Sequence, residues 1–354
     1  MSMLESLTRK LVSRESLDES EAAGAALLLL EAEVSAVERM EFLRALAHKG
    51  ETPVEVAAFA HTFRRLARNP GLEAWAGRAV DIVGTGGDHF GSYNISTTAA
   101  FITAAGGVPV IKHGNRAITS QSGTSDFLGA LGVATEATSA ELLASLESLN
   151  FCFLFAPAYH PAFKELMPVR KALAAEGQRT IFNLLGPLIN PAQPAHLLMG
   201  VFAETWVKPL ATALGSLGVK RGLVCHGRLS EVASGLDELT TAGDNRIAGF
   251  GELAAMDTVF GAALFGLREC EPEVLKGGTA AQNVEMLGEI AAGTAPGGLT
   301  DTVLFNAGAA FWVAGKAETL IEGIAQARTI VESGALRDWL LRLKAFNSRG
   351  TAVR

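Results

Sequence analysis

Three short motifs between positions 81 and 116 hold the residues best suited to chemistry. They read DIVGTGGD at 81–88, NIST at 94–97 and KHGNR at 112–116. Glycines lack a Cβ, so the first motif can adopt positive φ angles and turn successive N–H groups toward an anion. The second offers side-chain donors at an expected helix N-terminus, which adds unpaired N–H groups and partial positive charge. Lys112 and Arg116 add full charges, so the motifs predict a site for a phosphorylated ligand and favour a polyphosphate.

A glycine-rich turn after a strand can also be a structural turn with no ligand. Two common nucleotide signatures are absent from this stretch. The sequence has no GxxxxGK[ST] motif, and His89 stands where the third glycine of a dinucleotide fingerprint would fall. The order and spacing of all three motifs nevertheless favour ligand binding over a purely structural turn.

An acidic pair and an arginine further along the chain could complete such a site. The adjacent carboxylates of Asp237 and Glu238 suit Mg²⁺, which takes oxygen ligands and bridges to substrate phosphates, although residue type alone fits a surface pair better. Arg170 has a planar guanidinium that can bind a carboxylate through two parallel bonds, or it is a solvated helix cation. His113 fits a core position and a hydrogen-bonding loop equally well, and we assign it no acid–base role.

The elements that must position these residues fall into two regions. Up to about residue 69 the chain reads as helices, and Asn69-Pro70-Gly71 is an expected break. Helix starts are indicated by a cap residue followed three positions later by glutamate, at Asp18/Glu21, Ser35/Glu38, Thr52/Glu55 and, later, Thr138/Glu141. From residue 79 short apolar strands alternate with helical runs; the strands are expected at Ala79–Val83, Val108–Ile111, Phe151–Phe155, Leu197–Phe202 and Gly222–Cys225. This alternation predicts an α/β fold with a mostly parallel sheet.

Composition excludes several other classes of protein. The 354-residue chain is 49% hydrophobic and 19% charged, which argues against disorder, and its formal net charge of −7 lacks the basic field that attracts nucleic acid. The longest aliphatic run, Ala25–Leu30, is too short to span a bilayer, and Met1–Arg14 does not resemble a signal peptide. Three scattered cysteines (Cys152, Cys225, Cys270) indicate free thiols in a reducing compartment. We expect a cytoplasmic enzyme with no nucleic-acid or membrane partner.

The three motifs, in this order and spacing, resemble those of the anthranilate phosphoribosyltransferases. The resemblance extends over nearly the whole chain and includes TPVE at 52–55, FAPAYHP at 155–161, VR at 169–170, TIFNLLGPL at 180–188, GLDEL at 235–239, LKGG at 275–278 and the helical C-terminal part from Phe305-Asn306 to Ala325. It implies transfer of the phosphoribosyl group of phosphoribosyl pyrophosphate (PRPP) to the amine of anthranilate, with release of pyrophosphate, in tryptophan biosynthesis.

The resemblance also implies an architecture and a set of ligands. It predicts a small helical domain at 1–73, to which helices from about 160–190 return, a large α/β domain at 76–354 that binds PRPP, and a homodimer. Two Mg²⁺ ions are expected at Ser96, Asp237 and Glu238. No side chain is expected to act as a nucleophile or base, because catalysis here needs positioning and charge stabilisation. The substrate-binding residues that it implies are Gly84, Gly87, Asp88, Ser92, Asn94, Ile95, Ser96, Thr97, Lys112, His113, Gly114, Asn115, Arg116, Ala117, Ile118, Thr119, Ser120, Thr124 and Arg170.

The sequence departs from the family pattern in four places. His89 replaces a usual glycine, Ser92-Tyr93 replaces a threonine-led pair, and segments at 174–177 and 228–234 look inserted beside the predicted site. Two alternatives therefore remain: an enzyme of the same fold with another acceptor, such as a nucleoside phosphorylase, and a homologue that binds nucleic acid without catalysis. Against the second, the net charge is negative and the motifs are intact.

Overall fold

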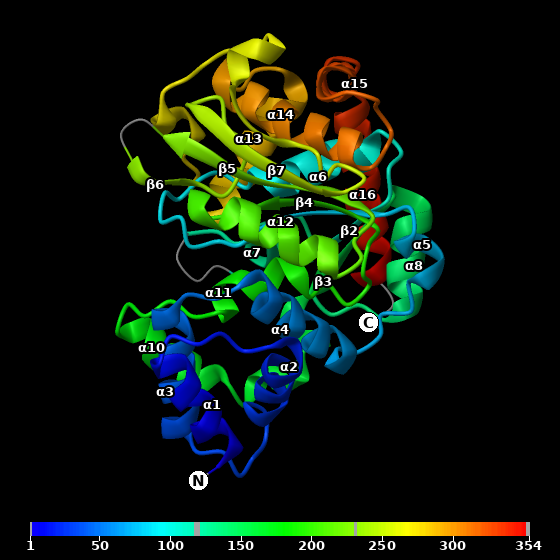
Figure 1. Cartoon of the computed structure of the whole chain (residues 1–354). Helices are drawn as coiled ribbons and strands as arrows, with labels where there is room; N and C mark the ends of the chain where they lie inside the picture. Colours follow the sequence, from blue (N-terminus) through cyan, green and yellow to red (C-terminus); the bar gives the residue numbers. More distant parts are fainter. Residues whose placement is uncertain (1, 117–120, 230–231, 352–354) are drawn as a thin grey trace.

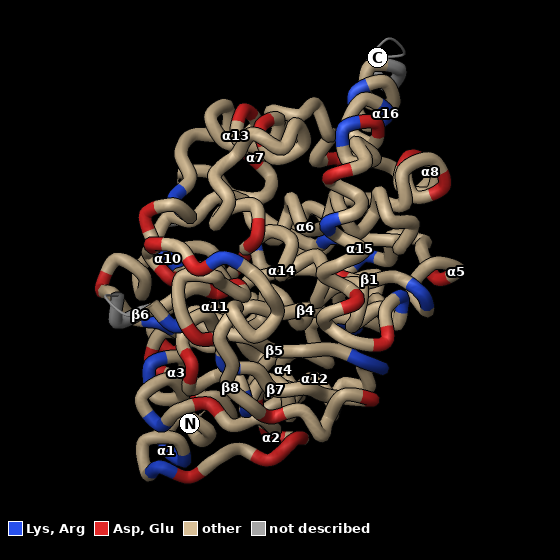
Figure 2. Tube along the Cα trace, turned by 90° about the horizontal axis from the view of Figure 1, so that it is seen from above, with Lys and Arg blue, Asp and Glu red and all other residues tan. Residues whose placement is uncertain are grey.

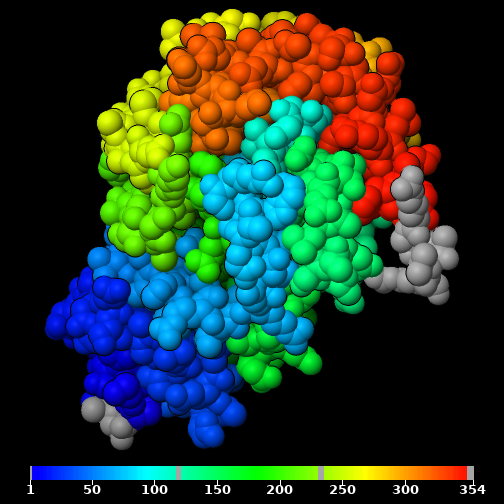
Figure 3. Space-filling model, turned by 90° about the vertical axis from the view of Figure 1, so that its right-hand side faces the viewer, coloured from blue at the N-terminus to red at the C-terminus, as the bar shows by residue number. Residues whose placement is uncertain are grey.

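The N-terminal region of the chain is a bundle of four helices. A computed structural model describes residues 2–116, 121–229 and 232–351. The bundle consists of α1 (Met3–Val12), α2 (Glu19–Leu28), α3 (Ala36–Lys49) and α4 (Pro53–Leu66) and forms one end of the molecule (Figures 1 and 3). The four predicted capping boxes are present, each with reciprocal bonds between the cap residue and the glutamate three positions later. Local side-chain to backbone hydrogen bonds thus explain where these helices begin.

An eight-stranded sheet follows, in the order β3-β2-β1-β4-β5-β7-β8, with β6 also paired to β5. The parallel part, β3 to β5, contains the five predicted strands; the bounds are β1 (Val80–Gly84), β2 (Val110–Gly114), β3 (Phe151–Phe155), β4 (His196–Gly200) and β5 (Arg221–Leu229). The antiparallel strands, which we did not predict, are β6 (Val232–Leu236), β7 (Asp244–Gly251) and β8 (Asp257–Gly261). The predicted fold class, α/β with a mostly parallel sheet beside a helical domain, is confirmed.

Alternating side chains of the central strands β1, β4 and β5 enter two separate hydrophobic cores. On one face, Ile82, Leu198 and Leu223 pack with α6 (Ile95–Ala105) and α14 (Gly297–Val313). On the other face, their neighbours Leu197 and Val224 pack with the helical bundle and with α12 (Val207–Ser216). The period of two along each strand therefore joins the bundle to the sheet through one continuous apolar layer.

The remaining helices complete the two layers. They are α5 (Glu73–Ala76), α7 (Thr124–Ala130), α8 (Ser139–Leu149), α9 (Ala156–Tyr159), α10 (Met167–Ala175), α11 (Phe182–Leu185), α13 (Ala280–Ala292), α15 (Leu320–Glu332) and α16 (Ala335–Thr351). Helices α10 and α11 contact α3 and α4, so the chain returns to the bundle after β3. The rings of Phe63 and Phe163, 4.7 Å apart, lie at this junction.

Lysine and arginine positions alternate with aspartate and glutamate positions along much of the described chain, as the coloured Cα trace of Figure 2 shows. None of the helices that the structure describes is long and apolar enough to cross a membrane.

Candidate active site

The glycine loop leaves the end of β1 and meets the acidic pair, which lies far away in the sequence. Gly86 and Gly87 have φ angles of +68° and +81°, which glycine adopts without steric cost. The N–H of Gly86 donates to Oδ2 of Asp237 at 2.6 Å. A Cβ at Gly84 would lie 2.2 Å from the same oxygen, so only glycine permits this close approach.

The second motif begins helix α6 beside this loop. The N–H of Ser96, in the first turn of α6, donates to Oε1 of Glu238 at 3.2 Å. Asn94 precedes the helix and is held by the buried Asn283 of α13, whose Nδ2 donates to Oδ1 of Asn94 at 2.8 Å. The two carboxylates of the acidic pair therefore each accept from an N–H group that the sequence predicts as an anion-binding donor.

Lys112, the buried cation of this site, lies beneath the second motif. It is 1% exposed, and its Nζ donates to the carbonyl of Ile82 and, at 3.3 Å, to Oγ of Ser96. Burial lowers the pKa of Lys112, while the charges of Asp81 and Glu238 oppose that lowering. Its ammonium group therefore holds the Ser96 hydroxyl at the start of α6 and places a buried positive charge beside the acidic pair.

Negative charge exceeds positive charge in this cluster. Burial raises the pKa of Glu238 to about 7 and that of Asp237 well above its ordinary value, and the charge of Asp88 adds to both increases. Oδ2 of Asp88 is buried and has no hydrogen-bond partner among the described residues. Such a cluster is stabilised by a cation.

The donor set fits Mg²⁺ shared with a ligand better than a metal ion held by protein alone. Among the described residues, no three His, Cys, Asp or Glu side chains are grouped closely enough to ligate one ion. Mg²⁺ commonly takes one or two protein carboxylates and fills its other positions with water and substrate phosphate oxygens. Asp237, Glu238 and the hydroxyl of Ser96 offer that type of incomplete ligand set.

An apolar pocket of about 500 Å³ adjoins the glycine loop, between the sheet and the returning helices. Of the predicted residues, Gly84, His113, Gly114, Asn115 and Arg170 line it. We did not assign the other lining residues to the site; they include Pro157, His160, Phe163, Met167, Phe182 and Asn183. Several belong to the FAPAYHP and TIFNLLGPL segments, so the signal was present in the sequence without a role attached.

Two buried histidines face each other in this pocket. The ring centroids of His113 and His160 are 5.4 Å apart, and Nε2 of each has no hydrogen-bond partner among the described residues. Burial lowers the pKa of His113 to about 3 and that of His160 to about 4, so both are neutral near pH 7. Nδ1 of His113 lies 3.2 Å from the carbonyl of Gly186 and must carry the proton, which leaves Nε2 as a hydrogen-bond acceptor.

Two cations line the pocket, the exposed Lys164 and the half-buried Arg170. The guanidinium carbon of Arg170 lies 5.1 Å from the centroid of the Phe182 ring, and burial lowers its pKa. It forms no salt bridge within the described residues. A partly desolvated guanidinium without a counter-ion is suited to an anionic ligand.

The structure brings some of the other predicted residues near the site and leaves four undescribed. Thr124 opens α7, Ser92 pairs with Lys276 in an isolated bridge, and Arg116 extends over the Phe155 ring with its guanidinium carbon 5.8 Å from the centroid. Ile95 and Thr97 are fully buried in the first turn of α6. Ala117, Ile118, Thr119 and Ser120 lie outside the described residues.

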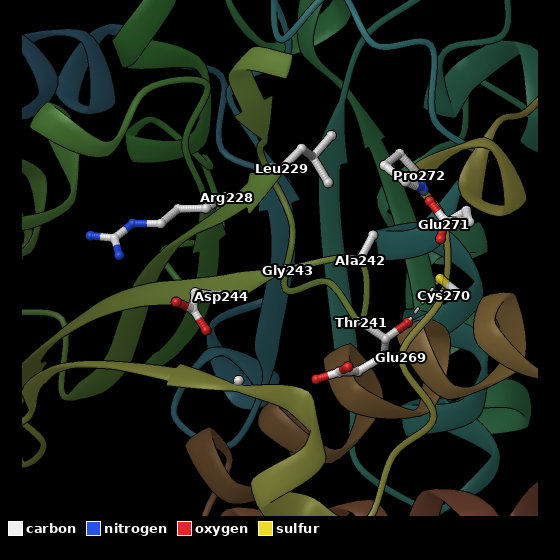
Figure 4. Close-up of a pocket in the computed structure, with 11 residues that line it drawn as sticks. Arg228, Leu229, Thr241, Ala242, Gly243, Asp244, Glu269, Cys270, Glu271 and Pro272 are labelled. Atoms are coloured by element: carbon white, nitrogen blue, oxygen red, sulfur yellow. Dashed lines mark hydrogen bonds between the residues drawn. The ribbon is translucent and has the colours of Figure 1, made fainter. Parts of the chain in front are cut away.

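A second cavity, of about 670 Å³, lies away from these motifs. It is bounded by β5, β7 and the 269–272 segment (Figure 4). Arg228 beside it is paired through two nitrogens with Glu204, at 2.6 and 2.8 Å, and Cys270 lies 3.2 Å from the hydroxyl of Thr241. None of the predicted site residues lines this cavity, so the glycine loop and the pocket beside it are the candidate active site.

A helical bundle followed by an α/β domain is the architecture of a class of glycosyl transferases, and both parts of this chain match models of that class. The family model described as "Glycosyl transferase family, helical bundle domain" matches residues 5–67, and the one described as "Glycosyl transferase family, a/b domain" matches residues 76–336.

Individual relatives narrow this class. The anthranilate phosphoribosyltransferase of Rhodospirillum rubrum is 47% identical over 86% of this chain and 84% of its own, and that of Thermus thermophilus is 43% identical over 96% and 98%. The crystal structure of a Thermus thermophilus anthranilate phosphoribosyltransferase matches with a TM-score of 0.85 at 42% identity, covering 97% of this chain and 99% of that one. A Saccharomyces cerevisiae anthranilate phosphoribosyltransferase in complex with PRPP and Mg matches with a TM-score of 0.82 at 26% identity, covering 98% of each chain. The chain belongs to the anthranilate phosphoribosyltransferase family, as its motifs predicted.

Proposed function

We propose that the chain transfers the phosphoribosyl group of PRPP to the amine nitrogen of anthranilate and releases pyrophosphate. The observation that supports the proposal most strongly is that the anion-binding glycine loop and the apolar pocket share residues. Gly84 and Thr85 belong both to the glycine loop, with its anion-binding donors, and to the apolar pocket that contains Arg170. A polyphosphate donor and an aromatic carboxylate can thus be held side by side, which is the main requirement of this substitution reaction.

In this proposal the polyphosphate is bound by the glycine loop, the start of α6 and the residues that follow β2. The N–H groups of Gly86 and Ser96 now meet carboxylates and would be available to phosphate oxygens once Asp237 and Glu238 turn to a metal ion. Two Mg²⁺ ions, held by Ser96, Asp237 and Glu238, would supply positive charge against the departing pyrophosphate. The charge excess of the acidic cluster supports this assignment.

Anthranilate would occupy the apolar pocket with its ring beside Phe163 and Phe182. Arg170 would bind its carboxylate. Nε2 of His113 would accept an N–H bond from the amine and so direct the nitrogen lone pair toward the ribose carbon. With a pKa of about 3, His113 is too weak a base to deprotonate the amine, and its role is orientation. The bond to nitrogen forms as the bond to pyrophosphate breaks, and the more acidic arylammonium product then loses its proton.

The direct test follows anthranilate fluorescence after mixing the protein with PRPP and Mg²⁺. Fluorescence should fall with stoichiometric release of pyrophosphate, stop when the metal is chelated with EDTA and resume with added Mg²⁺. Loss of PRPP and release of pyrophosphate without consumption of anthranilate, when other amines or bases are added, would instead support the enzyme with another acceptor.

The remaining assignments concern the state of the protein in the cell. We infer a cytoplasmic homodimer that associates through the helical bundle, where Met3, Val12, Val37 and Val54 are each at least half exposed. We also keep the domain division at 1–73 and 76–354. Light scattering coupled to size exclusion would test the dimer, and a monomer at micromolar concentration would contradict it.

A further inference from the structure

We propose that Arg179 is a positioning residue for the pyrophosphate site. It holds the carbonyl of Gly87 on the outer side of the glycine loop and thereby directs the N–H of Asp88 toward the bound pyrophosphate. The inference rests on the proposed function for its ligand. Arg179 lies between α10 and α11, outside the three motifs.

The contacts of Arg179 place its guanidinium directly against the loop. Nη2 donates to the carbonyl of Gly87 at 2.6 Å, and the guanidinium carbon lies 3.9 Å from the centroid of the Phe202 ring. The charge of Asp88 opposes the lowering of the Arg179 pKa by burial, so this carboxylate is close as well. Phe202 is itself tied to the loop, since its N–H donates to Oγ1 of Thr85 at 3.0 Å.

Each peptide of the loop is therefore fixed by a different part of the fold. The N–H of Thr85 donates to the carbonyl of Gly200 in β4 at 3.0 Å, the N–H of Gly86 donates to Asp237, and the carbonyl of Gly87 accepts from Arg179. The peptide between Gly87 and Asp88 is trans, so its N–H points opposite to its carbonyl. With the carbonyl bonded to the solvent-exposed Arg179, the N–H of Asp88 points to the opposite side of the peptide, away from Arg179. This N–H donates to no acceptor within the described chain, which leaves it for a ligand.

The segment that carries Arg179 is anchored to the helical bundle. Glu176 forms a salt bridge with Arg44 of α3. Nε2 of His48, also in α3, lies 3.3 Å from Oε1 of Gln178. The N–H of Thr180 is fixed by Oδ1 of Asn183 at 2.9 Å. Arg179 thus links the bundle to the phosphate loop, and residues 174–177, which looked inserted in the sequence, form the end of α10 and the turn that follows it.

A surface arginine could instead act on pyrophosphate by long-range attraction alone. Salt distinguishes the two mechanisms, because attraction between exposed charges falls steeply with ionic strength, whereas the direction of a peptide group does not depend on it. Arg179→Met retains an unbranched side chain that can pack on Phe202 and removes the hydrogen-bond donors. Arg78→Met is the matched control: Arg78 is also exposed and lies over an aromatic ring, with 4.1 Å from its guanidinium carbon to the Trp75 centroid.

The experiment measures PRPP binding with Mg²⁺ by calorimetry at low and high KCl for the parent chain and both variants. Arg179→Met should weaken binding on the order of tenfold at both salt concentrations, the effect of one lost ligand hydrogen bond. The KM for PRPP should rise in parallel while the KM for anthranilate stays within about twofold of the parent value, because the loop does not bind the acceptor carboxylate. In ¹⁵N-aspartate-labelled protein, the Asp88 amide should shift downfield with PRPP in the parent and in Arg78→Met, and much less in Arg179→Met.

Unchanged affinity in Arg179→Met, or a loss that disappears at high salt, would overturn the positioning role. So would an Asp88 amide shift equal to that of the parent. A parent chain that binds no PRPP would refute the proposed function itself, which separates the two failures. Thermal unfolding of both variants should match, because both arginines are exposed.

Discussion

The two halves of the candidate active site, the phosphate side and the acceptor pocket, have unbalanced charges of opposite sign. On the phosphate side, the carboxylates of Asp237 and Glu238 are crowded together, and Lys112 is the buried cation near them. On the acceptor side, Arg170 lies in an apolar pocket without a counter-ion among the described residues, and two histidines are held neutral. The phosphate side needs added cations to balance its carboxylates. The acceptor side needs an added carboxylate to balance Arg170. Each half therefore indicates its missing ligand by the sign of its unbalanced charge.

The largest expected effect comes from removing the excess negative charge. Asp237→Asn with Glu238→Gln preserves shape and an oxygen acceptor for the N–H groups of Gly86 and Ser96, but removes the anionic metal ligands. Turnover should fall by a factor on the order of a thousand or more, since the charge that stabilises the leaving group is lost. Steady-state kinetics with Mg²⁺ measures it, and thermal unfolding checks the fold. Activity within about tenfold of the parent would remove both residues from the metal site.

A second change breaks the phosphate side without altering its charge. At Gly86, φ is +68° and a Cβ would meet nothing within 4 Å, so Gly86→Val acts through backbone conformation alone. A β-branched residue strongly disfavours that conformation, at a cost of roughly 1–3 kcal/mol, and the loop should rearrange. PRPP affinity measured by calorimetry should fall by about a hundredfold at the upper end of that cost. Near-parental binding by a folded variant would show that the loop is only a turn.

The smallest expected effect uses pH to compare the halves. The pKa of His113 is lowered from its unfolded value to about 3, so the unfolded chain binds more protons between about pH 6.5 and 3, and His113 makes stability fall as pH decreases through that window. Glu238, with a pKa raised to about 7, acts in the opposite direction between about pH 7 and 4.3, because there the folded chain binds more protons. The measured dependence of stability on pH is therefore the sum of the contributions of His113 and Glu238.

A variant separates the two contributions. His113→Gln should lose less stability than the parent between about pH 6.5 and 5, by up to about 1.4 kcal/mol per pH unit. Urea unfolding at the two pH values measures this difference. Parallel pH dependence of the two proteins would mean that His113 is protonated as easily in the folded as in the unfolded chain.

Local structure was predictable from the sequence because its causes are local. The cap at Thr52 and the strand Phe151–Phe155 follow from neighbouring residues, and the structure has both as expected. The antiparallel strands β7 and β8 were missed, since their alternation is weak and their pairing depends on distant partners: β7 pairs with β5, and β8 pairs with β7.

The site was predictable only in part for the same reason. The motifs identified the phosphate donors, but the contact between Gly86 and Asp237 joins residues 151 positions apart, and no local pattern encodes it. The view that Asp237 and Glu238 form an ordinary surface pair is wrong, because the structure buries them to 8% and 9% exposure. The acceptor pocket depends on the return of the chain to the bundle after β3, so His160 and Phe182 received no role.

In the proposed mechanism, the enzyme transfers a phosphoribosyl group to an aromatic amine and recognises that amine by its carboxylate. The most direct test compares one variant with the parent on two acceptors. The kcat/KM of the parent and of Arg170→Ala is measured with anthranilate and with aniline, which has the amine and lacks the carboxylate. Arg170→Ala should lower kcat/KM for anthranilate by roughly ten- to over a hundredfold, the worth of about 1.5–3 kcal/mol for a charge-assisted bond. It should leave the slow reaction of aniline and the affinity for PRPP nearly unchanged. Equal losses for both acceptors, or aniline turned over by the parent as fast as anthranilate, would contradict this mechanism.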